Sequence, residues 1–221
     1  MRSGKWSLGD RLPGERALAE QMGVSRPSVR EAIRVLEAMG IVRTAVGSGP
    51  DAGAAIIDRP AVGLGAAVRL HIASGTLPVR DVVATRAVLE VWATGQAAQR
   101  CEDGTDFSGL YAMLDDLEAS HPTPSEFVAH DAAFHMGLVK LADNQLTEAV
   151  LGGLRAAVGD YIVLGAERLP SWSAASRRLC GEHRAILDAV ATGDAVTASQ
   201  LAHNHIWGFY EEAGLASEVA E

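Results

Sequence analysis

The sequence has few cysteines, few aromatic residues and no long apolar segment. Its two cysteines, Cys101 and Cys180, lie far apart without CxxC spacing, which excludes a zinc ribbon or redox motif and favours reduced, buried thiols over a disulfide. No run of about 18 apolar residues occurs, and the opening residues lack the apolar segment of a secretory signal. We therefore expect a cytoplasmic protein with no membrane partner.

The composition indicates a folded protein of two unlike parts. Of its 221 residues, 48% are hydrophobic and 5% aromatic, which favours packed helices over a disordered chain. The net charge of -9 argues at face value against nucleic acid. However, residues 1–60 carry nine Lys or Arg against seven Asp or Glu, whereas residues 61–221 carry ten against 21. We expect a near-neutral to basic head that meets an anionic polymer, and an acidic body with another task.

Residues 12–39 contain two helical patterns separated by a short break. Pro13 and Gly14 precede the first pattern, Gly23 ends it, and Ser25 is placed to cap the second. The second pattern has one apolar and one basic stripe, formed by Val29, Ile33 and Leu36, and by Arg26, Arg30 and Arg34. This arrangement predicts a helix-turn-helix that reads the major groove of DNA. From periodicity alone, an amphipathic hairpin with a solvated arginine face stays open.

The segment LPGERALAEQMGVSRPSVREAIRVLEAMGIV resembles the winged helix-turn-helix of GntR-family bacterial transcription regulators. The resemblance implies a two-stranded wing with strands at 41–44 and 54–57 and the tip VGSGPDAGA, which we prefer to a phosphate-binding loop. It also implies DNA contacts from Arg16, Ser25, Arg26, Ser28, Arg30 and Gly49.

Two features depart from the family pattern. Pro27 stands where Thr is common, which removes one hydroxyl able to contact phosphate. Family members usually have a further helix before this segment, whereas about ten residues precede it here. A start truncated upstream is one explanation of the second departure.

After a linker around 58–65, the sequence is almost continuously helical in pattern. The breaks HPTPS and LPSWS and the pair Gly193-Asp194 predict helices at 62–74, 78–100, 107–120, 125–142, 145–168, 172–192 and 194–213. The predicted fold is mainly α. A winged helix-turn-helix domain (1–59) is followed by a linker and first helix (60–75) and by an antiparallel all-helical bundle (76–221).

Polar residues lie inside the apolar stripes of three of these helices. Asp131 and His135 are one turn apart on a face that should be buried, and His183 and His205 lie on the apolar faces of two later helices. Unpaired polar groups there would cost on the order of 1–3 kcal/mol each, so a shared divalent metal is a reasonable partner. By spacing alone, core histidines satisfied by backbone carbonyls or neighbouring groups are the alternative.

The segments DAAFHMGLVKLADN and GEHRAILDAVATGDAVTASQLAHNHI resemble the FCD ligand-binding domain of the FadR-type branch of GntR regulators. The resemblance implies metal ligation, with zinc preferred over nickel, manganese or iron, by Asp131, His135, His183 and His205. It also implies that Arg86 meets an anionic effector, although an arginine stem buried with its head at the bundle end stays open. Asn144 is expected to line the same pocket.

Other residues near these positions are expected elsewhere. We expect His203 at the surface or rim, and His130 and Glu182 to face away from the site because they adjoin the ligands in sequence. The large aromatic residues are interpreted as core or pocket wall, namely Trp92, Trp172, Trp207 and Tyr161.

These observations predict a metal-containing regulator that responds to a small carboxylate effector. It would act as a homodimer and repressor on a roughly palindromic operator in double-stranded DNA, with the bundle as the metal-binding, effector-binding and dimerisation domain. A metal-dependent hydrolase or oxygenase is the alternative. The sequence has no HExxH motif, no pair of ExxH motifs and no GxSxG motif, so we expect no enzyme. A third alternative is a helical protein with a purely structural metal.

Overall fold

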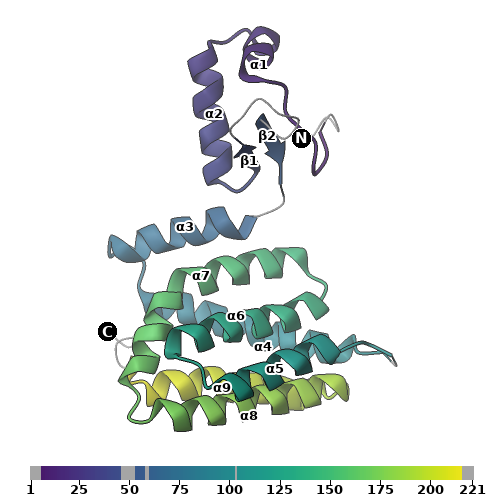
Figure 1. Cartoon of the computed structure of the whole chain (residues 1–221), viewed down its shortest axis with the longest axis vertical. Coiled ribbons are helices and arrows are strands. Elements are labelled where there is room, and N and C mark those ends of the chain that lie inside the picture. Colours follow the sequence, from purple (N-terminus) through teal and green to yellow (C-terminus); the bar gives the residue numbers. More distant parts are fainter. Residues whose placement is uncertain (1–5, 46–52, 58–59, 103, 216–221) are drawn as a thin grey trace.

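The computed structural model describes residues 6–45, 53–57, 60–102 and 104–215. A small N-terminal head lies beside a larger helical bundle (Figure 1). The head contains α1 (Glu15–Met22), α2 (Arg26–Ala38) and the antiparallel strands β1 (Val42–Ala45) and β2 (Gly53–Ile56). Gly49 and the other residues of the expected wing tip from 46 to 52 lie outside the described residues, whereas its last two residues, Gly53 and Ala54, belong to β2.

Local sequence signals explain the turn between α1 and α2. Gly23 ends α1 in the left-handed region with a φ of 67°, where a side chain would be strained. The Ser25 hydroxyl accepts a hydrogen bond from the Ser28 backbone N–H at 3.2 Å, and Pro27 fits the first turn of α2. The two strands pair with Val42 opposite Ile56, and both side chains are buried in the small core of the head.

The body consists of seven helices within the described ranges. These are α3 (Pro60–Ala73), α4 (Val79–Gln99), α5 (Ser108–Ser120), α6 (Pro124–Leu141), α7 (Gln145–Arg168), α8 (Trp172–Ala191) and α9 (Ala195–Glu212). Each helix end lies within two residues of its predicted position. The helices α3 and α6 begin earlier than expected because Pro60 and Pro124 are accommodated in a first helical turn. Part of the expected linker is therefore helical.

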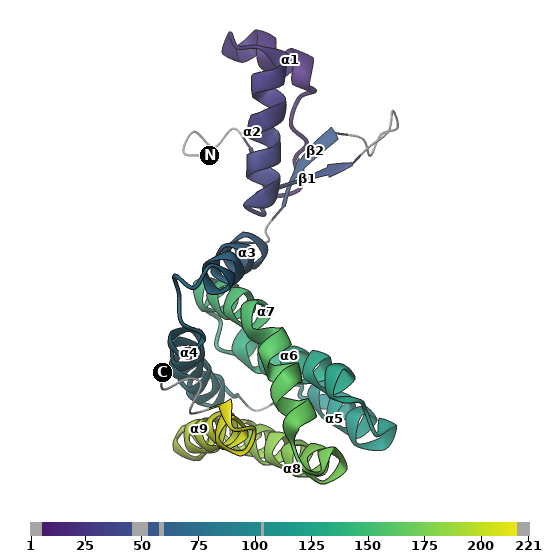
Figure 2. The ribbon, with the colours of Figure 1, turned by 90° about the vertical axis from the view of Figure 1, so that its left-hand side faces the viewer.

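The helix α3 lies along α7 on the side of the bundle nearest the head, while α8 and α9 lie at the far side (Figure 2). A Cβ added at Gly65 would lie 2.9 Å from the backbone oxygen of Gly153, so the backbones of α3 and α7 are in direct contact. A Cβ at Gly63 would lie 2.7 Å from the backbone oxygen of Met39, at the end of α2. Glycine thus permits close packing on both sides of α3.

The apolar core of the bundle surrounds the long helix α7. Among the described helices, α7 alone is long and apolar enough to cross a membrane, with a mean hydropathy of 1.4 in an 18-residue window. Half of that window is buried inside the protein, and α7 also carries Arg155 and Asp160. These features are typical of the core helix of a helical bundle.

Candidate functional site

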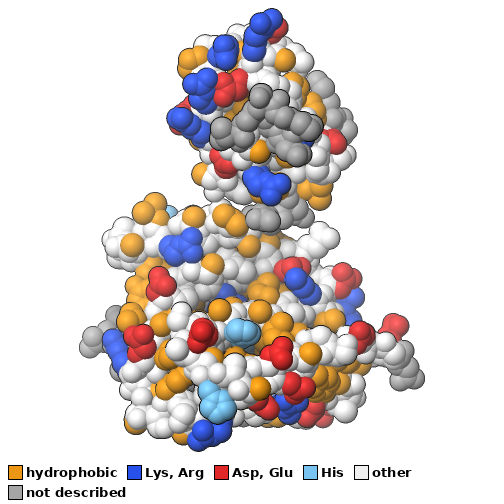
Figure 3. Space-filling model, in the orientation of Figure 1, with side chains coloured by type: hydrophobic (Ala, Val, Ile, Leu, Met, Phe, Trp, Pro, Cys, Tyr) orange, Lys and Arg blue, Asp and Glu red, His pale blue; other side chains and the backbone are white. Residues whose placement is uncertain are grey.

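Basic side chains gather on the part of the head formed by α1 and α2 (Figure 3). Arg16 and Arg26 are exposed, and Arg30 lies in the second turn of α2. The hydroxyls of Ser25 and Ser28 lie 2.8 Å apart. One hydroxyl hydrogen between them is left free for an outside acceptor such as phosphate.

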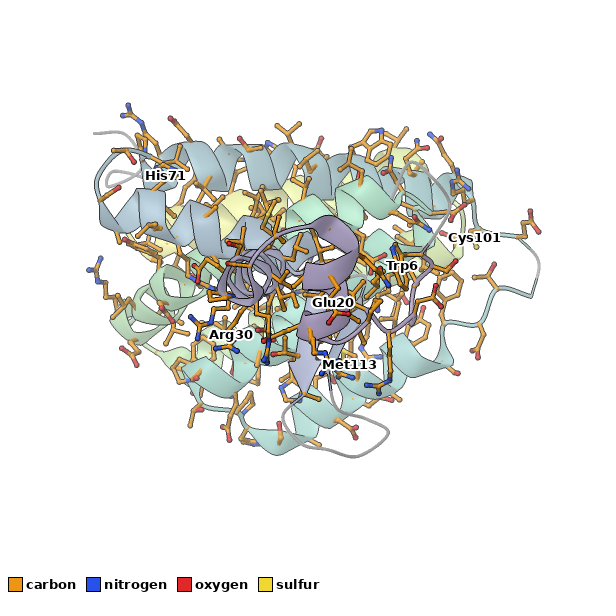
Figure 4. The ribbon with its side chains drawn as sticks, turned by 90° about the horizontal axis from the view of Figure 1, so that it is seen from above. Trp6, Glu20, Arg30, His71, Cys101 and Met113 are labelled. Atoms are coloured by element: carbon orange, nitrogen blue, oxygen red, sulfur yellow. The ribbon has the colours of Figure 1, made fainter. Side chains whose placement is uncertain are left out.

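In the free protein, Arg30 is held by an ion pair within the head. Its Nε and Nη2 atoms donate to Glu15 at 3.0 and 2.9 Å, and this hydrogen bonding lowers the pKa of Glu15. Arg16 forms an exposed ion pair with Glu20. Figure 4, which views the molecule from above, labels Glu20 and Arg30 on the head. Phosphate or guanine would therefore compete with Glu15 for Arg30.

The structure brings Asp131, His135, His183 and His205 together. Asp131 and His135 come from α6, His183 from α8 and His205 from α9, and one ligand atom from each lies within 4.8 Å of all the others. The Nε2 atom of His205 lies 3.3 Å from that of His135 and 3.1 Å from that of His183. Ligands about 2.1 Å from one metal lie roughly 3.0–3.4 Å apart, so the donor spacing fits a shared cation.

Carboxylates outside the cluster orient two of the imidazoles. Nδ1 of His205 lies 2.8 Å from Glu182 Oε2, and Nδ1 of His135 lies 3.3 Å from Glu90 Oε2. An Nδ1–H facing each carboxylate leaves the lone pair of each Nε2 atom directed at the other. Two such lone pairs 3.3 Å apart repel unless a proton or a metal ion lies between them, so the arrangement fits a metal that both atoms ligate.

The charge balance of the cluster also favours a cation. Burial, with the nearby His205, lowers the pKa of His183 to about 3. Burial also acts to lower the pKa of His205, but Asp131 and Glu182 outweigh it and raise that pKa above its ordinary value. Burial also lowers the pKa of His135. Neutral His135 and His183 can therefore ligate a metal, and the carboxylates beside His205 favour a proton or a metal ion there.

Three charged residues next to the cluster were not identified from the sequence as part of it, namely Arg155, Glu90 and Glu182. Arg155 donates through Nη1 to both carboxylate oxygens of Glu90 at 2.7 Å, and through Nη2 to Asp131. Arg155 thereby holds in place the proposed ligand Asp131 and also Glu90, which is the partner of the proposed ligand His135.

The expectation that Glu182 faces away is wrong. Successive helix residues point about 100° apart, so Glu182 does face away from His183, but this direction leads to His205 on α9.

A buried cavity of about 30 Å³ adjoins the cluster. Asp131, His135 and His205 form its polar wall, and Arg86 reaches it from α4. The Arg86 side chain is 5% exposed, and its Nε atom lies 3.1 Å from Glu90 Oε1. Within the described part of the chain, Arg86 Nη1 has no hydrogen-bond partner. A buried guanidinium with a free donor beside a cavity is suited to bind an anion.

The other expected residues lie away from this cavity. Asn144 is exposed at the start of α7, where its side chain accepts a hydrogen bond from the Thr147 backbone N–H at 3.0 Å. Helix capping explains Asn144, so we do not include it in the effector site. His203 and His130 are exposed, and Nδ1 of His130 lies 2.8 Å from the backbone oxygen of Glu126.

The head and the bundle together define a two-part DNA-binding regulator. The chain belongs to the GntR family of bacterial regulatory proteins and carries an FCD domain. The model of the gntR family matches residues 1–50, and that of the FCD domain matches residues 81–207. Members of the family bind DNA operators and small-molecule effectors, and FCD domains often bind metals.

The similar proteins are transcriptional regulators, and the similarity extends over most of the length of both chains. The HTH-type transcriptional regulator LutR of Bacillus subtilis is 26% identical, covering 96% of this chain and 98% of that protein. Mce2R of Mycobacterium tuberculosis is 29% identical (91% and 82%), and the Glc operon transcriptional activator of Escherichia coli is 27% identical (92% and 80%). The family and these relatives are transcriptional regulators and not enzymes.

Solved structures show the same fold. A GntR protein of Streptococcus agalactiae aligns with a TM-score of 0.65 at 23% identity, covering 94% of this chain and 92% of the other. McbR/YncC of E. coli aligns with a TM-score of 0.55 at 16% identity, covering 97% and 91%. The prediction of a winged helix-turn-helix followed by a helical bundle is confirmed.

Proposed function

We propose that this regulator, a member of the FadR-type branch, binds a divalent metal and senses a small carboxylate. Residues 1–59 would read the DNA, residues 76–221 would bind the metal and effector, and residues 60–75 would join them. Asp131, His135, His183 and His205 would hold the metal, with zinc preferred over nickel, manganese and iron. The bound metal would supply an electrophile for an oxygen of the effector.

One observation supports this proposal above the others. Arg86, whose Nη1 donor has no partner among the described residues, lines the same cavity as three members of the cluster, namely Asp131, His135 and His205. A carboxylate in that cavity could place one oxygen on the metal and another on the guanidinium. A purely structural metal would not require a buried arginine with a free Nη1 donor beside it.

The metal and its role can be tested with His183→Ala. The fully buried His183 provides one of four ligands, so we expect the variant to lose bound zinc and the effector response while it still binds DNA. His130→Ala is the matched control because His130 is an exposed imidazole beside the ligand Asp131 in the sequence, and its Nδ1 faces a backbone oxygen. Metal content, circular dichroism and operator affinity are measured on both variants.

The outcomes separate the two roles of the metal. Unfolding of His183→Ala together with unfolding of wild type on zinc removal would favour a structural metal. Equal zinc content in both variants and wild type would contradict the proposed ligand set. A His183→Ala variant that stays folded but no longer responds to the effector would support a role of the metal in sensing.

We propose that the protein acts as a homodimer through the groove between α4 and α9. Trp92 and Val196 at this groove are 42% and 81% exposed. The residues that line it include Gln96, Ser199 and His203, and none of them is Asp, Glu, Lys or Arg. A second copy has the same acidic body, so an uncharged face is the place where two copies approach without charge repulsion.

Sedimentation velocity of Trp92→Glu tests this surface. Burying a carboxylate in a symmetric contact places one on each side of the interface, so we expect monomers where wild type forms dimers. A wild-type monomer, or a dimer that the substitution leaves unchanged, would contradict the proposed surface. Metal binding by Trp92→Glu provides the control for folding.

We further propose repression in the cytoplasm, with two heads on a palindromic operator. Such a dimer excludes other proteins from the DNA that it covers. Transcription in vitro from a selected operator should fall when the protein is added and recover with effector. A rise on addition of the protein would show activation instead.

A further inference from the structure

A second hollow, on the outside of the bundle, adjoins the buried cavity. It has a volume of about 390 Å³ and lies between the connection of α5 to α6 and the first half of α8. His121 and Pro122 form one side of this outer groove, while Ser176 and Cys180 form the other. Of the residues that line the outer groove, Trp172 alone also lines the buried cavity.

The indole of Trp172 forms the layer between the two spaces. Its Nε1–H donates to the backbone oxygen of Pro122 at 2.7 Å. Its ring meets Phe127 edge-on, with centroids 5.2 Å apart, and Phe127 stacks on the ligand His183 at 6.0 Å. A path from the outer groove through the position of this indole therefore leads directly to the histidine cluster.

Most of the other side chains that line the cavity are shielded from solvent. Apart from Trp172, its lining side chains are buried, with only Val128 and Asp131 partly exposed. The cavity of about 30 Å³ has space for roughly two water molecules. A carboxylate with more than a few non-hydrogen atoms cannot fit there unless a wall moves.

Trp172 occupies a position from which it can move. It is the first residue of α8, and the Ser171 side chain before it makes no capping hydrogen bond. The first turn of α8 is therefore held without a cap, and Trp172 is anchored to the neighbouring connection through the Pro122 hydrogen bond.

We propose that Trp172 is the gate between the outer groove and the metal cluster and sets the size of effector that the site accepts. This inference rests on the proposed function, because it assumes that a carboxylate binds beside the metal. Displacement of the indole would join the two spaces. A small carboxylate would need only brief opening, whereas a large one would need the indole to stay displaced.

The test compares Trp172→Ala, Trp172→Phe and the control Trp6→Ala on protein loaded with Co²⁺. The visible absorption spectrum of the metal reports binding of acetate and of citrate by titration and stopped flow. In Trp172→Ala we expect citrate to bind on the order of tenfold more tightly than in wild type, because no indole has to be displaced from its closed position before citrate binds. Acetate affinity should change little, and both acids should enter faster.

The two other variants sharpen this comparison. Trp172→Phe keeps a ring but loses the hydrogen bond to Pro122, so faster acetate entry with weak citrate binding is expected. Trp6→Ala removes an indole from the head, outside both spaces, and should match wild type in the binding of both acids. If Trp172→Ala fails to fold, Trp172→Phe provides the test, because faster acetate entry than in wild type would support the gate and an equal rate would overturn it.

Failure of the gate and failure of the metal proposal can be told apart. Identical rates and affinities in wild type and both Trp172 variants would overturn the gate. If Co²⁺ does not bind at all, the metal proposal fails, and diethyl pyrocarbonate then reports access to His183 and His205 in the metal-free proteins. Faster modification in Trp172→Ala than in Trp6→Ala would support the gate, and equal rates would overturn it.

Discussion

Replacement of Glu90 by Gln tests the charge network that supports the metal cluster. Glu90 is 1% exposed and pairs with Arg155 at 2.7 Å, with Arg86 at 3.1 Å and with His135 at 3.3 Å. Burial acts to raise its pKa, but Arg155 and Arg86 outweigh burial and lower the pKa of Glu90 from 4.5 to about 2. The difference corresponds to roughly 3 kcal/mol of folding free energy in the charged form.

The sign of this contribution fixes its pH dependence. A carboxyl with a pKa depressed by folding stabilises the protein above its ordinary pKa, and this stabilisation is lost as the pH falls from about 4.5 towards 2. Glu90→Gln carries no charge at any pH. The variant should therefore be less stable than wild type by roughly 3 kcal/mol at pH 7, and the deficit should shrink below pH 4.5.

Urea denaturation of metal-free protein, followed by circular dichroism at pH 7, 5 and 3.5, measures the deficit. Asp115→Asn is the matched control, since Asp115 pairs with Arg184 at 2.7 Å but is 67% exposed. We expect this control to change stability by less than about 1 kcal/mol. A Glu90→Gln variant as stable as wild type at pH 7, or a deficit equal at all three pH values, would refute the reasoning.

Two further predictions concern the packing of α7 and the head. Gly153→Ala should destabilise the bundle by about 1–3 kcal/mol because its Cβ would lie 3.1 Å from the Gly65 backbone nitrogen. Gly159→Ala is the control on the same helix, since its Cβ would meet nothing within 4 Å, and it should stabilise the bundle slightly. Urea midpoints in the opposite order would contradict this packing. Arg26→Ala should weaken operator binding and reduce the dependence of log affinity on log salt by about one phosphate contact. An unchanged salt dependence would show that Arg26 does not contact phosphate.

The inward positions of the four proposed metal ligands could be predicted because each lies on the apolar stripe of its own helix, whereas a shared metal was implied by the resemblance to FCD domains. Asp131 and His135 are four residues apart on an apolar stripe, and a buried imidazole needs a partner. The contacts among the helices could not be predicted in the same way. Glu182 and Glu90 reach their histidines across helix boundaries, and such pairs depend on how the helices cross rather than on spacing along one of them.

Helix ends could be predicted to within two residues because Gly, Pro and capping side chains act locally, as Gly23 and Ser25 show. Asn144 illustrates the opposite case. Asn144 is the last residue of the DAAFHMGLVKLADN segment and was expected to line the pocket, but its side chain caps α7. Capping and ligand binding use the same polar side chains, so one sequence cannot separate them.

The most direct test of the central claim is the affinity of zinc-loaded protein for an operator selected from genomic DNA, measured at fixed ionic strength against a panel of small carboxylates. Our account predicts that at least one carboxylate changes the affinity of wild type, and that Arg86→Met, which removes the free donor in the cavity, abolishes this change while zinc stays bound. An unchanged operator affinity with every carboxylate, or a response of equal size in Arg86→Met, would contradict it.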